Sequence, residues 1–196
     1  MKLATEVNLT EKTKKKTLFF IALFFILGIY VVSYGARTSS ARITFVPADS
    51  LIVNIDNYVN TKIETEGVIA HVCGVDGKKM KLLSENGEVV VIIPNDTTSF
   101  DYSLNKKRIK VYGLVKEDRI DKSYLDEKEE EKVLLCHVDH TPCKDTKWVN
   151  AKIEAGVADT LSKQQIEARR EKMERKGKGY ISIVTIVCEK YEIVAE

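Results

Sequence analysis

The sequence predicts a mainly β domain with helical additions, preceded by a helix that spans a membrane. Two observations support this prediction. Residues 17–34 form an uncharged apolar run, and from residue 62 onward short segments alternate apolar with polar residues. The chain has 196 residues, of which 44% are hydrophobic and 31% charged, a composition typical of one folded domain plus an extra segment.

The apolar run at residues 17–34 predicts a transmembrane anchor. As a helix it would extend ~27 Å, close to the ~30 Å hydrocarbon core of a bilayer. Four lysines in residues 12–16 precede the run, so the positive-inside rule keeps residues 1–16 in the cytoplasm. We therefore expect a single-pass protein of the inner (cytoplasmic) membrane, with a linker at residues 35–46 and an extracytoplasmic domain after it. A cleaved signal peptide and a buried soluble helix are the alternatives.

The domain at residues 47–196 opens with a helix candidate at residues 47–59 and continues with strands. Asn86-Gly87 is a hairpin signal between the second strand and the third, and Gly67 predicts a bulge within the first. Five strands with a helical excursion before the last fit a small Greek-key barrel of OB type. The predicted strands are residues 62–73, 78–84, 88–93, 108–115 and 180–189.

The excursion covers residues 122–179 and is rich in charged helix formers. A first helix is expected at residues 122–135, whose run of Glu and Lys indicates a solvated face. A second helix is expected after Ser162, since residues 162–165 have the form of a capping box, and Gly177 is placed to end it. The sequence therefore predicts a five-stranded barrel with a helical insertion before its last strand.

Several motifs of the domain resemble a group of uncharacterised exported OB-fold proteins of Bacteroidetes-type bacteria. The similarity covers residues 47–194 and implies an exported OB-fold; it implies no activity, because no function is established for that group. The motifs are Glu66-Gly67-Val68, His71-Val72-Cys73, Gly77-Lys78-Lys79, Val111-Tyr112-Gly113, residues 117–121 and Gly177-Lys178-Gly179-Tyr180.

All three histidines and three of the four cysteines fall in two short clusters. On a strand, His71 and Cys73 point to the same side, where they could share a metal ion. In the second cluster, Cys136 and His140 would share a helix face if the helix reached them. Neither spacing matches a standard zinc motif. The candidate metal ligands are His71, Cys73, Cys136, His137, His140 and Cys143, for zinc or haem iron.

Disulfides are the competing interpretation of the same cysteines, because an even number of cysteines in an oxidising compartment tends to pair. Cys136 with Cys143 would close a short loop. Cys73 with Cys188 would join the first and last strands, which we expect to be neighbours in the barrel. This arrangement predicts that His71 and Cys73 lie near Cys188. Free thiols and a partly buried strand pair without a ligand remain open.

Three functions compete. The first is a non-enzymatic envelope protein whose barrel binds a metal ion, a small ligand such as haem, or a partner protein. It is similar in plan to the haem chaperone of cytochrome c maturation, although here no histidine follows the last strand. The second is oligonucleotide binding, the common use of OB barrels. Its candidate ligand-binding barrel face is Lys79, Lys81, Arg108, Lys110 and Tyr112, with Tyr102 nearby.

The third candidate function is a redox or metal-dependent enzyme that uses the Cys/His clusters. No nucleophile elbow and no glycine-rich phosphate loop occurs in the sequence. The net charge of +2 implies no large single-sign field, and a domain outside the cytoplasm rarely meets nucleic acid. A binding protein of the cell envelope is therefore the expected class, with no catalytic residues.

Overall fold

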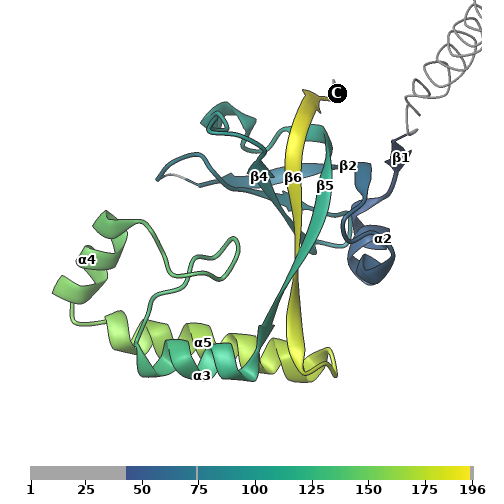
Figure 1. The fold of residues 1–196 in the computed structure, drawn as a ribbon. Helices are drawn as coiled ribbons and strands as arrows, with labels where there is room; N and C mark the ends of the chain where they lie inside the picture. Colours follow the sequence, from purple (N-terminus) through teal and green to yellow (C-terminus); the bar gives the residue numbers. More distant parts are fainter. Residues whose placement is uncertain (1–42, 74, 195–196) are drawn as a thin grey trace, which may run out of the picture. The chain divides into compact units, whose positions relative to one another are not determined.

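The computed structural model describes residues 43–73 and 75–194 (Figure 1). The predicted cytoplasmic residues 1–16, the predicted anchor at 17–34 and most of the linker at 35–46 lie outside these ranges. Within them, no helix has both the length and the apolar character needed to cross a bilayer.

Five strands close into a barrel, as the sequence predicts. They are β2 (Lys62–Val72), β3 (Met80–Leu83), β4 (Val89–Pro94), β5 (Arg108–Asp121) and β6 (Tyr180–Ile193). Their order is β2-β3-β4-β6-β5, and pairing of β2 with β5 closes the ring. The β4–β6 pair is parallel and the other pairs in the ring are antiparallel. A short β1 (Thr44–Phe45) runs parallel to β2. This mainly β architecture is compatible with an OB-fold.

Alternating residues of the strands fill the barrel. In β5, Ile109, Val111 and Val115 are fully buried, while Arg108 and Lys110 face outward as predicted. The lead-in helices α2 (Ala48–Val53) and η1 (Ile55–Asn57), together with η2 (Tyr102–Leu104), add apolar side chains to the same core. Burial of this apolar surface is the main force that stabilises the barrel.

Two glycines allow the barrel strands to approach closely. A Cβ atom on Gly67 would lie 2.4 Å from the carbonyl oxygen of Leu83, and one on Gly113 would lie 2.2 Å from that of Val187. The predicted bulge at Gly67 is wrong. The register of β2 against β3 shifts two to four residues later, between Ile69 and His71. Gly67 is needed for contact with the neighbouring strand.

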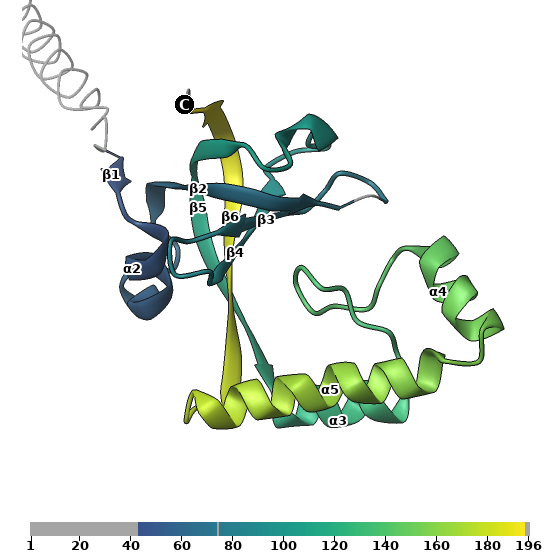
Figure 2. The same cartoon turned by 180° about the vertical axis from the view of Figure 1, so that it is seen from behind.

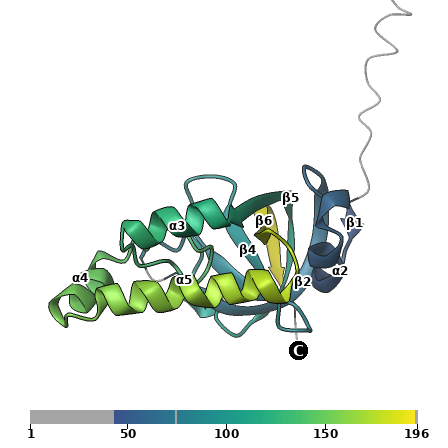
Figure 3. The same ribbon diagram turned by 90° about the horizontal axis from the view of Figure 1, so that it is seen from below.

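Strands β5 and β6 are longer than predicted and continue past the barrel as a two-stranded ribbon (Figures 1 and 2). The ribbon leads to α3 (Lys122–Glu130), α4 (Thr146–Glu154) and α5 (Ala158–Arg175). Helices α3 and α5 lie side by side at its far end (Figure 3). A second apolar core joins these helices to the ribbon and to Val91 of the barrel.

The predicted helix bounds in this excursion are wrong in two places. Helix α3 ends at Glu130, and Lys132 takes a left-handed backbone with φ of 54°, so the helix does not reach Cys136. Cys136 and His140 therefore share no helix face. Helix α5 begins four residues before the predicted cap, and Ser162 lies inside it, where its hydroxyl donates to the carbonyl of Val133 at 2.8 Å. Gly177, with φ of 61°, follows the helix end as expected.

Candidate functional site

The bulge in β2 determines where His71 and Cys73 point. Up to Ile69, every second residue of β2 is buried in the barrel. At the register shift, Ala70 is an extra residue of β2 and is exposed. After it, the buried position moves from the odd-numbered residues to Val72. An extra residue in a strand reverses the face on which the following side chains lie. His71 and Cys73 are thereby turned out of the barrel core.

The second cluster forms a small hairpin between α3 and α4. Leu135 pairs with Pro142 in antiparallel fashion, Cys136 N donates to Thr141 O at 2.7 Å, and Cys143 N donates to Leu134 O at 2.8 Å. In such a pairing, Cys136 and Cys143 are diagonal neighbours on one face. The hairpin therefore presents both thiols to the same side.

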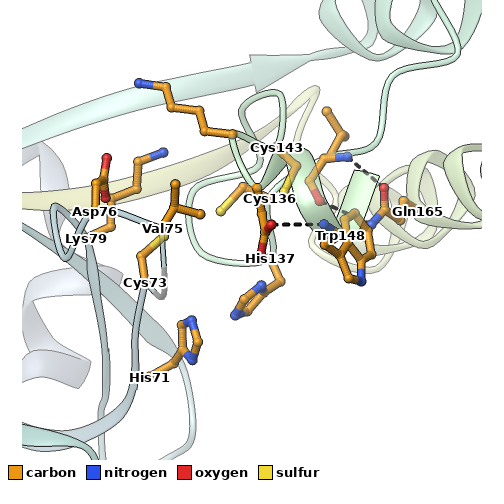
Figure 4. A pocket seen from close by; sticks show the side chains of 13 residues that line it. His71, Cys73, Val75, Asp76, Lys79, Cys136, His137, Cys143, Trp148 and Gln165 are labelled. Carbon is orange, nitrogen blue, oxygen red and sulfur yellow. Dashed lines mark hydrogen bonds between the residues drawn. The ribbon is translucent and has the colours of Figure 1, made fainter. Parts of the chain in front are cut away.

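The end of β2 and the hairpin line one cavity of about 260 Å³, with the two clusters on facing walls (Figure 4). The ring centroids of His71 and His137 are 4.5 Å apart, with an interplanar angle of 61°. We call this cavity the His/Cys pocket and define it by His71, Cys73, Cys136, His137, Cys143 and Trp148. Five of the six predicted ligand candidates thus line one cavity.

Burial favours the neutral form of three groups in this pocket, His71, His137 and Cys136. The pKa of His71 is lowered by burial and by the charge of Lys81. The pKa of His137 is lowered by burial and by the neighbouring His71 and Lys81. Burial also raises the pKa of the Cys136 thiol, against backbone hydrogen bonds that favour the thiolate. At neutral pH the imidazoles are therefore in the form that binds metals, while the thiol must lose a proton to do so.

An ion pair between Lys79 of the barrel and Asp139 fastens the hairpin to the pocket wall. Only 16% of the lysine side chain and 15% of the aspartate side chain are exposed. Asp139 also accepts from Thr141 Oγ1 at 2.9 Å. Burial alone would raise the pKa of Asp139, but the hydrogen bonds from Lys79 and Thr141 outweigh it and lower that pKa. Lys79 thus holds the hairpin in place.

His140 lies outside the His/Cys pocket. Its Nδ1 atom is 2.8 Å from Nη2 of Arg169. A guanidinium can only donate, so Nδ1 is the acceptor and the proton of the neutral ring is on Nε2. Burial, with the charges of Arg169 and Lys172, lowers the pKa of His140 to about 4. His140 is thereby fixed as a neutral group that donates through Nε2.

The described residues contain no group of three or more His, Cys, Asp or Glu side chains arranged to hold a metal ion. All four cysteines are free thiols, so neither predicted disulfide is formed. The pocket therefore brings candidate ligands together without a finished ligand set or a cross-link.

The prediction that His71 and Cys73 lie near Cys188 is wrong. Strand β6 pairs with β4 and β5, and β2 pairs with β5 and β3, so the first and last barrel strands are not neighbours. Cys188 pairs with Gly113, which lies opposite Ile63 at the far end of β2 from Cys73. Cys188 is 6% exposed in the barrel core, and burial raises its thiol pKa to about 11. It is a packing residue.

The predicted ligand-binding barrel face is not one free basic surface. Arg108 pairs with Glu66 at 2.9 Å, and Lys110 pairs with Glu64 at 3.0 Å. Lys190 lies 5.5 Å over the ring of Tyr112, while Lys79 and Lys81 line cavities beside the excursion. The carboxylates that neutralise this face come from β2, far from β5 in the sequence.

Sequence reasoning missed Trp148 and Gln165. Trp148 is the only tryptophan of the chain and lies on α4, whose first turn is capped by Asp145 accepting from Trp148 N at 2.9 Å. Gln165 of α5 bonds both backbone groups of Leu135, at 2.8 and 3.1 Å, and so holds the hairpin against the helix. The cap motif at Asp145 is the signal that would have predicted α4.

Neither a protein-family model nor a curated protein matches the chain. The resemblance to exported OB-fold proteins therefore remains a prediction. What the site can do is inferred from its own geometry.

Proposed function

We propose that the domain is a non-enzymatic binding module of OB type that holds a transition-metal ion in the His/Cys pocket. The observation that supports this is the convergence of two clusters, distant in the sequence, on the walls of one cavity. The sequence predicts that residues 17–34 anchor the protein in the inner membrane. We therefore propose that the protein binds its metal ion in the cell envelope.

The donor chemistry favours a borderline or soft metal. Thiolate and imidazole ligands suit Zn²⁺ and Cu(I), whereas Mg²⁺ and Ca²⁺ prefer oxygen. His71 and His137 are already neutral and close together, and Cys73, Cys136 and Cys143 are within the same cavity. Binding requires these side chains to rotate toward a common centre and at least one thiol to lose its proton.

The size of the cavity favours an ion over haem. Pockets for cofactors and drug-sized ligands are roughly 300–1,000 Å³, while the His/Cys pocket measures about 260 Å³. Oligonucleotide binding has less support, because carboxylates pair with Arg108 and Lys110 on the barrel face.

Metal analysis of the full-length chain tests this function. The reduced protein in detergent is incubated with Zn²⁺, or anaerobically with Cu(I), then desalted and analysed for metal and for alkylatable thiols. We expect one bound ion per chain and protection of two or more thiols from alkylation. The double variant His71→Ala/His137→Ala should weaken binding at least tenfold.

The matched control is His140→Asn, which removes the histidine outside the pocket and should retain the metal. A folded wild-type protein that binds neither metal, or that loses metal equally in both variants, would contradict the proposal. Retention of native circular dichroism distinguishes lost binding from lost folding in each variant.

A further inference from the structure

A second cavity of about 180 Å³ lies where α5 and the segment after it face the β3–β4 hairpin and the start of β6. The residues that line it include four lysines, Lys81, Lys172, Lys176 and Lys178, and one residue with a carboxylate, Glu88. Glu88 pairs with Lys176 at 3.0 Å and approaches Lys172 at 4.0 Å. We call this the basic cavity. Its lining carries three more positive charges than negative ones, from four lysines and one glutamate.

A buried guanidinium adds to the positive potential behind this cavity. Arg169 is 9% exposed, and its Nε has no hydrogen-bond partner among the described residues. Its Nη atoms contact neutral groups, the carbonyl of Gln165 and the ring of His140, which itself lines the basic cavity. Buried arginines are ordinarily paired with carboxylates. Among the described residues, Arg169 instead has a lysine, Lys172, nearby. Burial lowers the pKa of Lys172, and the positive charges of Lys176, Lys81 and Arg169 lower it further. The carboxylate of Glu88 acts in the opposite direction.

We infer that the basic cavity binds a phosphate group. Lysine is a common binder of phosphate as a point charge, and a dianionic phosphate balances the excess positive charge better than a single carboxylate does. The proton on His140 Nε2 supplies a further donor at the wall, since Arg169 occupies Nδ1. The hydroxyl of Ser182, another wall residue, is buried without a partner among the described residues.

Glu88 acts as an internal competitor for this phosphate group. It occupies Lys172 and Lys176 when no external anion is present, so its removal frees two ammonium groups. Two kinds of variant should therefore change the phosphate affinity in opposite directions. Loss of lysines weakens phosphate binding, and loss of the glutamate strengthens it. A purely structural role of the same ion pairs would not produce that pattern.

The test is a calorimetric titration of the full-length chain in detergent with inorganic phosphate at fixed ionic strength. We expect saturable binding that is at least tenfold weaker in Lys81→Gln/Lys172→Gln and at least threefold tighter in Glu88→Gln. The control is Lys163→Gln, an exposed lysine of α5 outside the cavity, which should bind as the wild type does. Circular dichroism verifies that each variant is folded.

Two further probes identify the source of the phosphate group. Glycerol 3-phosphate, the soluble analogue of a phospholipid head group, should bind more tightly than inorganic phosphate if a lipid supplies it, and more weakly if free phosphate does. The inference is overturned if sulfate, phosphate and chloride bind alike, or if Glu88→Gln leaves folded protein with unchanged phosphate affinity. Metal binding in the His/Cys pocket is measured separately, so either proposal can fail alone.

Discussion

The barrel and the excursion side of the domain differ in how many buried polar atoms lack a hydrogen-bond partner among the described residues. Inside the barrel, alternating strand residues form an apolar core in which Thr65 is the one described residue with a buried, unpartnered polar atom. On the excursion side and its ribbon, three residues carry such atoms: Glu117, Arg169 and Ser182. Unsatisfied buried polar groups destabilise a fold. Most of the described polar atoms that are buried without a partner therefore lie on the excursion side and its ribbon, where we propose that ligands bind.

The largest expected effect is in the barrel, at Gly113. A Cβ atom there would meet the Val187 carbonyl at 2.2 Å and Ile186 Cγ2 at 2.7 Å, so Gly113→Ala must displace a paired strand. We expect a loss of about 3 kcal/mol in the free energy of unfolding, measured by chemical denaturation. Gly179→Ala is the control, since nothing lies within 4 Å of its Cβ position. Equal stability of the two variants would refute the close approach of β5 and β6.

The next effect is on the excursion side and depends on pH. His140 has a folded pKa of about 4, below the ordinary value of 6.5, so the unfolded chain binds its proton more readily. The contribution of neutral His140 to the free energy of unfolding is therefore complete above pH 6.5 and is lost as the pH falls toward 4. We expect this loss to reach up to about 3 kcal/mol.

The measurement is the free energy of unfolding from pH 7.5 to 4, with chelator present. His140→Asn is the matched variant, because asparagine tolerates the left-handed backbone at this position, where φ is 62°. Its stability should fall less steeply over this pH range. The lowered pKa values of His71 and His137 act in the same direction and remain in both proteins. Parallel pH profiles would show that His140 is not the titrating group.

The smallest effect is expected on the outer barrel face. Arg108 is 45% exposed and pairs with Glu66, so Arg108→Gln should change the free energy of unfolding by less than about 1 kcal/mol. Binding of a single-stranded oligonucleotide should be weak in the wild type and unchanged in the variant. Tight oligonucleotide binding that is lost with Arg108 would reverse the assignment of the binding site to the junction.

The barrel strands could be predicted from the sequence because each has one buried face. Residues 116–121 could not be recognised as strand, since they are mostly charged and only Ile120 is buried. Their partner residues on β6 impose the extended conformation, and that pairing is not visible locally. Helix α4 was missed because no buried residue marks it and the cap at Asp145, which accepts from Trp148 N, was not recognised.

The members of the candidate site could be selected from the sequence, but their meeting could not. Clustering of histidines and cysteines indicated the residues, whereas the face on which His71 lies depends on the bulge at Ala70. Glycine at position 67 gave the stronger local signal for a bulge and was misleading. His140 was grouped with the other ligands because nothing in the sequence places Arg169 against it.

The excursion begins after Asp121 and ends before Tyr180, and these two residues are paired across the ribbon. For the barrel, the whole segment is therefore a single hairpin connection whose ends are already held together. The entropy of closing such a connection grows only logarithmically with its length. Insertions or exchanges within the excursion should thus leave the barrel register intact while replacing one wall of the His/Cys pocket. Under the proposed function, this one exchangeable segment supplies Cys136, His137 and Cys143, so its exchange should change the metal preference of the pocket.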